Sequence, residues 1–182
     1  MSRASAKMSI LPKRGFTIIE LLVVIAIIII LAGLILSTVG YVQKKGARSR
    51  AEAEIAAMSA ALESYKADNG IYPTDSIKTD VDPSASPTPA ASSLYLYEQL
   101  SGDVDNNRVA ETKSYFTFRP NQLSPSDQSQ NIRAIRDPFG NIYGYSTAKA
   151  LGKTYGNNPT YDLWSIADDS AGTNQTKWIK NW

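Results

Sequence analysis

The sequence contains no cysteine and no histidine among its 182 residues. Without cysteine there can be no disulfide bond, no thiol nucleophile and no zinc site with cysteine ligands. Without histidine, the side chain used most often as a general base is also missing. An enzyme of this composition would need a serine–lysine or a carboxylate site, and no such arrangement is recognisable in the sequence. The composition therefore argues against a catalytic function.

The chain also has little net charge, formally +2 from 19 basic and 17 acidic residues. A nucleic-acid-binding domain usually carries a strong excess of lysine and arginine, so the charge gives no indication of a nucleic-acid partner. The basic residues are unevenly placed, because the first 15 residues contain four of them and no acid. These four are Arg3, Lys7, Lys13 and Arg14.

One very apolar run stands out from a polar remainder. Mean hydropathy is −0.24 although 43% of the residues are hydrophobic. The sixteen residues from Leu21 to Leu36 have no polar side chain, and the sequence stays uncharged as far as Val42. About 20 predominantly apolar residues are needed for a helix to cross a bilayer, so a membrane span is predicted. An ordinary cleaved signal is the less favoured alternative, because its apolar region has only about 7–15 residues.

The apolar run continues into a segment rich in alanine, glutamate, lysine and arginine, which all favour helix. Apolar residues recur there at spacings of three and four, as on one face of a helix: Ile55, Met58, Leu62 and Tyr65. Asn69 and Gly70 provide a stop signal, and Pro73 lies just beyond. The pattern predicts one helix over about residues 16–68, apolar all round in its first half and amphipathic in its second.

Four basic residues follow the apolar run closely: Lys44, Lys45, Arg48 and Arg50. A solvated helical face is the simplest interpretation, and binding of lipid headgroups or acidic neighbours is the alternative. They equal the four positive charges before the run, so the distribution of positive charge does not orient the chain in a membrane by itself.

Beyond the helix, the sequence predicts a small α/β region. Prolines among small residues at 75–93 indicate a loop, and a short helix is expected at 94–100. Asp137–Gly140 fits a type I turn, with proline second and glycine fourth. Three segments rich in aromatic and β-branched residues are predicted to be strands: 114–119, 142–147 and 161–167. The predicted fold class is therefore α+β, with the long helix packed on a small antiparallel sheet.

The most specific signal is the segment at 13–22, KRGFTIIELL. A basic pair, a glycine, Phe-Thr and then an acid inside an apolar run form an unusual combination. The segment resembles the cleavage and methylation site of type IV prepilins and type II secretion pseudopilins. This resemblance implies that a prepilin peptidase cleaves after Gly15 and that Phe16 becomes the N-methylated N-terminus.

The same resemblance implies a type IV pilin-like division of the chain. A leader peptide would occupy 1–15, a transmembrane and filament-core helix 16–42, and a head domain 43–182. The head would contain an amphipathic helix, a Pro- and Ser-rich loop and an α/β subdomain: 43–69, 75–93 and 94–182.

Glu20 needs an explanation, because a carboxylate within a membrane helix costs about 2.5–3.5 kcal/mol and such residues are usually functional. One interpretation places it among lipid headgroups, since it lies only four residues after the predicted new N-terminus. The other is a charge pair with the protonated amine of Phe16 on the previously added subunit, which methylation would leave positively charged. The flanking motif favours the pair.

Four further segments are similar to the major pseudopilin of type II secretion. One matches the end of its long helix, one its DPWGNPY turn, one its YDLWSLGADG strand and one its terminal IGNW. Here they read KADNGIYPT, DPFGNIY, YDLWSI and IKNW, at 66–74, 137–143, 161–166 and 179–182. Together with the N-terminal motif they cover about half of the chain, and 75–136 has no match.

The resemblance implies a structural subunit rather than an enzyme. It would sit in the inner membrane with a single span and a periplasmic head, and would assemble into a helical homo-oligomer that drives protein export across the outer membrane. Its implied partners are the prepilin peptidase, minor pseudopilins and the inner-membrane secretion platform. The alternatives are a type IV pilin of a surface fibre for adhesion, motility or DNA uptake, and a membrane-anchored enzyme or receptor.

Members of this family bind calcium in the C-terminal loop through backbone carbonyls and three aspartates. By that resemblance Asp169 corresponds to the first aspartate and Ile166 to a carbonyl donor. The two later aspartates fall at Lys177 and Trp178, so those ligands are lost. Calcium takes six to eight oxygen ligands, several of them usually carboxylate, and the loss puts the site in doubt.

Two alternatives remain for this loop. Other polar side chains could replace the missing ligands and keep a calcium ion bound: Asp168, Asn174 and Thr176. Alternatively, the loop holds no metal and is ordered by packing of Trp178 and Trp182.

Overall fold

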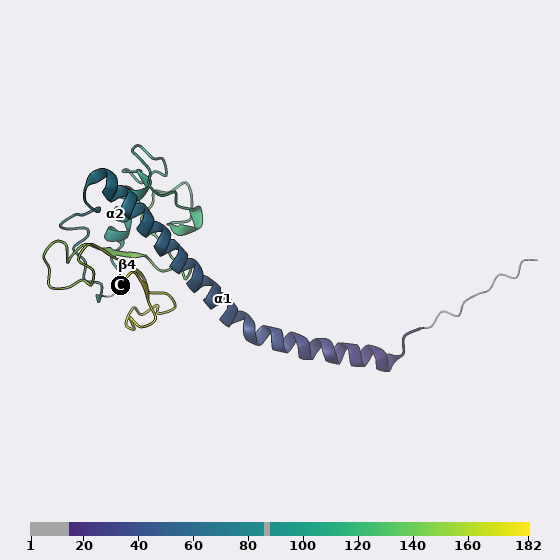
Figure 1. Ribbon diagram of the computed structural model, residues 1–182. Coiled ribbons are helices and arrows are strands. Elements are labelled where there is room, and N and C mark those ends of the chain that lie inside the picture. The colour runs from purple at the N-terminus through teal and green to yellow at the C-terminus, as the bar shows by residue number, and fades with distance from the viewer. Residues whose placement is uncertain (1–14, 86–87) are drawn as a thin grey trace, which may run out of the picture. The chain divides into compact units, whose positions relative to one another are not determined.

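The computed structural model describes residues 15–85 and 88–182 (Figure 1). Apart from Gly15, the predicted leader at 1–15 lies outside the described residues. Contacts divide the chain into one unit that ends at Val42 and a second that begins at Gln43. The elements are α1 (Ile18–Asn69), α2 (Ala90–Ser101), the 3₁₀ turn η1 (Pro120–Gln122), β1 (Leu123–Ser124), β2 (Ala134–Ile135), β3 (Gly144–Ser146), β4 (Asp162–Ser165) and β5 (Ile179–Lys180).

The long helix is confirmed, since α1 begins and ends within two residues of the predicted limits. In the first unit its side chains from Ile18 to Leu36 are all exposed. By length and composition this part can cross a membrane. Apolar residues of this kind contact lipid or other apolar surfaces in preference to water.

In the second unit, which we call the head, the predicted apolar face of α1 is buried. Met58 and Leu62 are completely inaccessible to solvent, and Ile55 is buried beside them. Two small residues, Ala47 and Ala51, continue the buried stripe toward the start of the head. The helix packs there on side chains from α2, from β2, β3 and β4, and from the residue before β3: Leu96, Leu100, Ile135, Tyr143, Tyr145 and Leu163.

The short second helix begins earlier than predicted. α2 starts at Ala90, directly after Pro89, so the predicted loop at 75–93 ends too late. The extra turn has no apolar periodicity, because its inward-facing residues include serines. Ser93 is buried, and its hydroxyl accepts a hydrogen bond of 2.9 Å from the Ile135 N–H of β2. The helix ends at Gly102, whose φ of 79° closes the C-terminus.

A three-stranded antiparallel sheet has the order β3-β4-β5. Tyr145 faces Leu163 across the first pair, and Trp164 faces Lys180 across the second. All four residues of β4 are buried. β3 lies within the predicted strand at 142–147, and β4 lies within the predicted strand at 161–167. Both predictions are confirmed.

The predicted strand at 114–119 is wrong. This segment has no ladder partner; the N–H groups of Tyr115 and Phe116 both donate to the Leu100 carbonyl, at 2.8 and 2.9 Å, and fold the segment onto the end of α2. Its aromatic rings pack on each other and on Tyr97, with Phe116 and Phe118 centroids 4.7 Å apart. The aromatic content therefore serves core packing rather than a sheet.

The predicted turn at Asp137–Gly140 is present, because the Gly140 N–H donates to the Asp137 carbonyl at 3.0 Å. The Asp137 carboxylate accepts the N–H groups of Phe139 and Asn141, at 2.9 and 2.8 Å. The hydroxyl of Ser165 also donates to this carboxylate and ties the turn to β4. Burial raises the pKa of the Asp137 carboxyl in spite of these donors.

β3 and β4 approach very closely at one point. A Cβ atom built on Gly144 would lie 2.0 Å from Cε2 of Trp164, so the indole ring rests directly on the glycine. Trp164 is completely buried and belongs to a second apolar cluster with Val81 and Trp178. The ring cannot move aside without disturbing that cluster.

We therefore expect Gly144→Ala to lower the free energy of unfolding by about 1–3 kcal/mol, the usual cost of overpacking. Gly46→Ala is the matched control, because Gly46 is an exposed residue of α1 and a Cβ there meets no atom within 4 Å. Alanine in a helix interior should raise stability by about 0.5–1 kcal/mol. Thermal unfolding of the full chain in detergent micelles, followed by tryptophan fluorescence, measures both changes. Equal melting temperatures for the two variants would contradict this account of the contact.

Candidate functional site

The start of α1 contains a reciprocal set of hydrogen bonds. The Glu20 N–H donates to the hydroxyl of Thr17 at 3.2 Å. In return, Glu20 Oε2 accepts the backbone N–H of Thr17 at 2.8 Å and its hydroxyl at 2.7 Å. This is a capping box, which satisfies N–H groups that a helix leaves without partners at its first turn.

Glu20 therefore has a local role that sequence reasoning missed. The signal was present as Thr17-x-x-Glu20, the usual pattern of a capping box. Both donors of Thr17 act on one carboxylate oxygen, Oε2. Among the described residues, no lysine or arginine forms an ion pair with Glu20. Phe16, the predicted new N-terminal residue, lies just before this first turn and is 86% exposed.

The C-terminal loop, residues 167–178, is organised around Asp169. This residue is buried, and its Oδ2 accepts the backbone N–H of Asn174 at 2.6 Å. The same oxygen accepts the indole N–H of Trp178 at 3.3 Å. The hydrogen bond from Asn174 is the main reason that the pKa of the Asp169 carboxyl lies below its ordinary value.

The polar residues proposed as substitute calcium ligands are more exposed than Asp169. Asp168, Asn174 and Thr176 are exposed. The side-chain oxygen of Asn174 accepts the backbone N–H of Thr176 at 3.1 Å and its hydroxyl at 2.5 Å. Within residues 15–85 and 88–182, no group of three acidic side chains suited to a metal ion includes Asp169. Two N–H groups already donate to Oδ2 of Asp169, so this side chain could offer a calcium ion at most its other carboxylate oxygen.

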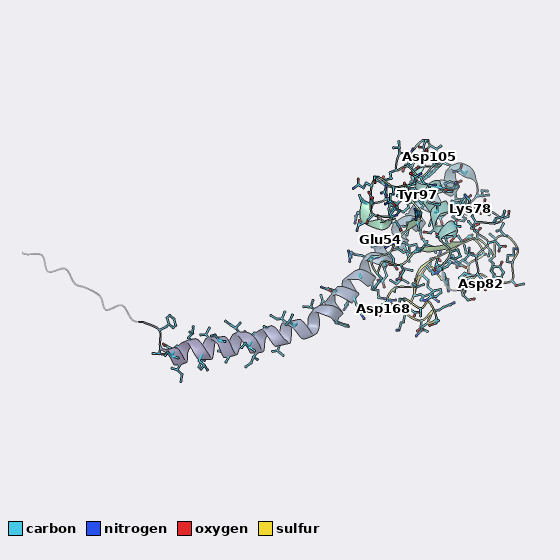
Figure 2. The ribbon with its side chains drawn as sticks, turned by 180° about the vertical axis from the view of Figure 1, so that it is seen from behind. Glu54, Lys78, Asp82, Tyr97, Asp105 and Asp168 are labelled. Atoms are coloured by element: carbon cyan, nitrogen blue, oxygen red, sulfur yellow. The ribbon has the colours of Figure 1, made fainter. Side chains whose placement is uncertain are left out.

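An acidic cluster does occur elsewhere in the head, in the loop that follows α2. Asp103, Asp105 and Glu111 place carboxylate oxygens within 4.8 Å of one another. Figure 2 shows Asp105 and Asp168 at opposite ends of the head, so this cluster is separate from the C-terminal loop. Its carboxylates accept hydrogen bonds from their own loop: the Arg108 N–H donates to Asp103 at 2.7 Å and the Val104 N–H to Glu111 at 2.9 Å. These bonds shape the loop.

Comparison with known proteins identifies the class first. A family described as "Prokaryotic N-terminal methylation motif" matches residues 11–36. The match covers the predicted cleavage site, the capping box at Thr17 and Glu20 and most of the exposed apolar helix. These features define a prepilin-type subunit that is anchored in a membrane by its N-terminal helix.

The particular family follows from relatives that match further along the chain. Type II secretion system core protein G of Aeromonas hydrophila is 38% identical over 172 residues, which cover 92% of this chain and 91% of the relative. The core protein G of Escherichia coli K12 is 42% identical over 62 residues. That of Klebsiella michiganensis is also 42% identical over 62 residues. The chain belongs to the family of type II secretion system core protein G, the major pseudopilin.

The coverage of these relatives differs. The matched segment spans 43% of the Escherichia coli protein and 44% of the Klebsiella michiganensis protein, and 34% of this chain in each case. The similarity to the Aeromonas hydrophila protein therefore carries the assignment of the head. No solved structure matches the chain.

The lowered pKa of Asp169 gives a prediction for pH dependence. An acid whose folded pKa lies below its unfolded value, about 3.9 for Asp, stabilises the fold above that value. This contribution is lost as the pH falls through the folded pKa. We expect Asp169→Ala to lower the melting temperature at pH 7, and the difference from the unchanged chain to shrink toward about pH 2 as the carboxylate is protonated.

Asp168→Ala is the matched control for this measurement, because Asp168 is the exposed neighbour. It should change the melting temperature little at either pH. A difference for Asp169→Ala that stays constant between the two pH values would show that the ionised carboxylate is not what stabilises the loop.

Proposed function

We propose that this chain is the structural, non-enzymatic main subunit of a type II secretion pseudopilus, assembled into a helical filament that drives protein export across the outer membrane. The observation that carries the proposal is the exposed apolar surface of α1 from Ile18 to Leu36. Lipid would cover this surface before assembly, and the same helices of neighbouring subunits would cover it in the filament. The relationship to core protein G of Aeromonas hydrophila supports this role.

Processing would occur between Gly15 and Phe16. The first helical residue is Ile18, so cleavage there leaves a new amine only two residues before the helix. The partial positive charge of a helix N-terminus disfavours a cation at that position. A carboxylate near the new amine is therefore needed to offset its charge once both groups leave water.

Glu20 would supply that carboxylate to a neighbouring subunit. Its Oε2 is engaged by Thr17 in the capping box, which leaves Oε1 as the oxygen for an incoming amine. The amine of Phe16 on the previously added subunit would donate to Oε1. Surrounded by apolar helices rather than water, opposite charges attract more strongly, and an unpaired carboxylate there is costly.

Membership of the family supports the remaining parts of the proposal. The span would lie in the inner membrane with the head in the periplasm. A prepilin peptidase would remove the leader, and minor pseudopilins and the inner-membrane secretion platform would be the partners in assembly. The heads would form the outer surface of the filament.

Processing is tested by the mass of the intact protein extracted from membranes. Removal of 15 of the 182 residues leaves a chain of 167 that begins at Phe16 and carries one added methyl group. A bulky residue in place of Gly15 should leave the leader attached, and Gly15→Ala should have a milder effect. Loss of a longer segment that ends beyond Val42 would instead make this a secreted protein.

The role of Glu20 is tested by the yield of filaments from two variants. Glu20→Gln keeps the capping box, because glutamine serves equally at that position, but removes the charge. We expect it to insert into the membrane normally and to lower filament yield about tenfold or more, since breaking one side of a buried ion pair costs about 3–5 kcal/mol. Glu20→Ala should also insert at least as well as the unchanged chain and assemble poorly.

Thr17→Ala is the control, because it removes the side-chain cap and keeps the charge of Glu20. Its cost to the helix is about 0.5–2 kcal/mol, and its filament yield should stay close to normal. Normal yield from Glu20→Gln together with poor yield from Thr17→Ala would show that Glu20 acts as a cap and not as a charge partner.

A further inference from the structure

We propose that Arg48 positions the C-terminal loop on helix α1 and takes the place of a divalent cation there. The loop lies far from Arg48 in the sequence. The guanidinium of Arg48 nevertheless donates to two consecutive backbone carbonyls at the end of the loop, Lys177 O at 2.7 Å from Nη1 and Trp178 O at 3.4 Å from Nη2. The planar guanidinium suits such a pair of acceptors because its donors point in fixed directions.

The orientation of this guanidinium is set from its other side. Nε of Arg48 lies 3.3 Å from Oε1 of Glu52, one turn further along α1. All three nitrogens of the guanidinium are therefore engaged, one by the helix itself and two by the loop. An arginine held in this way loses less conformational freedom when the loop docks than a free one would.

The contact reaches the centre of the loop through Trp178. The Trp178 indole N–H donates to Asp169 at 3.3 Å, and the same carboxylate oxygen accepts the Asn174 N–H at 2.6 Å. The ring of Trp178 also stacks on Trp164, with centroids 6.3 Å apart and planes within 9°. Arg48, Trp178 and Asp169 thus form one connected network that fixes both ends of the loop.

The charge of Arg48 bears directly on cation binding. The resemblance to metal-binding relatives places two ligand aspartates at 177 and 178, where this chain has Lys177 and Trp178. These positions hold a lysine and a tryptophan instead of carboxylates. Their backbone carbonyls accept hydrogen bonds from the guanidinium of Arg48, which carries a permanent positive charge. A calcium ion at this place would lose anionic ligands and meet a like charge. In this chain Arg48, and not a bound metal, supplies the positive charge beside these two positions.

Hydrogen exchange on the full chain in detergent micelles tests the proposal and does not depend on filament assembly. The reporters are loop amides with acceptors inside the loop, those of Gly172, Asn174 and Lys177. Arg48→Ala should speed their exchange about tenfold or more, as expected when charged hydrogen bonds that hold a segment are lost. Amides in the buried part of α1, such as that of Met58, should change much less.

Arg50→Ala is the matched control, because Arg50 is an exposed arginine two residues further along the same helix. It removes the same charge and should leave the loop amides unchanged. Glu52→Ala removes the ion pair that orients the guanidinium and keeps both donors to the carbonyls, so we expect a smaller increase in exchange than for Arg48→Ala. Arg48→Lys is the milder variant; it keeps the charge without the paired donors, and we expect an intermediate increase.

Calcium provides the second arm of the experiment. In the unchanged chain, exchange of the three loop amides should be the same in millimolar calcium and in excess chelator. Calcium that slows their exchange tenfold, with the effect abolished by Asp169→Ala, would overturn the proposal. Equal effects of Arg48→Ala and Arg50→Ala on the loop amides would overturn it as well.

Discussion

The apolar side chains of α1 face two different surroundings. Those from Ile18 to Leu36 are exposed in the isolated chain, whereas Met58 and Leu62 are buried in the head. Burial of apolar surface is the main favourable term in folding and association. The apolar residues of α1 in the head are therefore buried within one chain. Those from Ile18 to Leu36 need lipid or other subunits to cover them. We propose that filament formation meets this second requirement.

Two carboxylates, one in the first turn of α1 and one in the C-terminal loop, each accept two hydrogen bonds on a single oxygen. Glu20 caps the first turn of α1 through Thr17, and we propose that its free oxygen pairs with the amine of another subunit. Asp169 accepts two hydrogen bonds on a single oxygen, Oδ2, and these bonds order the C-terminal loop. In both places the hydrogen bonds on the carboxylate decide what else it can bind.

The sequence was most informative where structure depends on local patterns. The helix α1 and the strands β3 and β4 follow from apolar spacing and from aromatic and β-branched content. The segment 114–119 has the same content, but its rings pack against Tyr97 and the end of α2 instead of joining a sheet. β1, β2 and β5 are only two residues long, too short for any periodicity. The contact of Arg48 with the loop joins residues 129 apart, which no local pattern reveals, whereas the capping box at Glu20 was readable.

The position of β5 affects when the head can fold. This strand, Ile179–Lys180, pairs with β4 and comes after all the other described strands in the sequence. The side of β4 that faces β5 has no partner until these last residues are available. Contacts between distant residues also form slowly, because a long loop must close first. The sheet is therefore completed only after residues 179–180 have been synthesised, and until then this edge of β4 is unpaired.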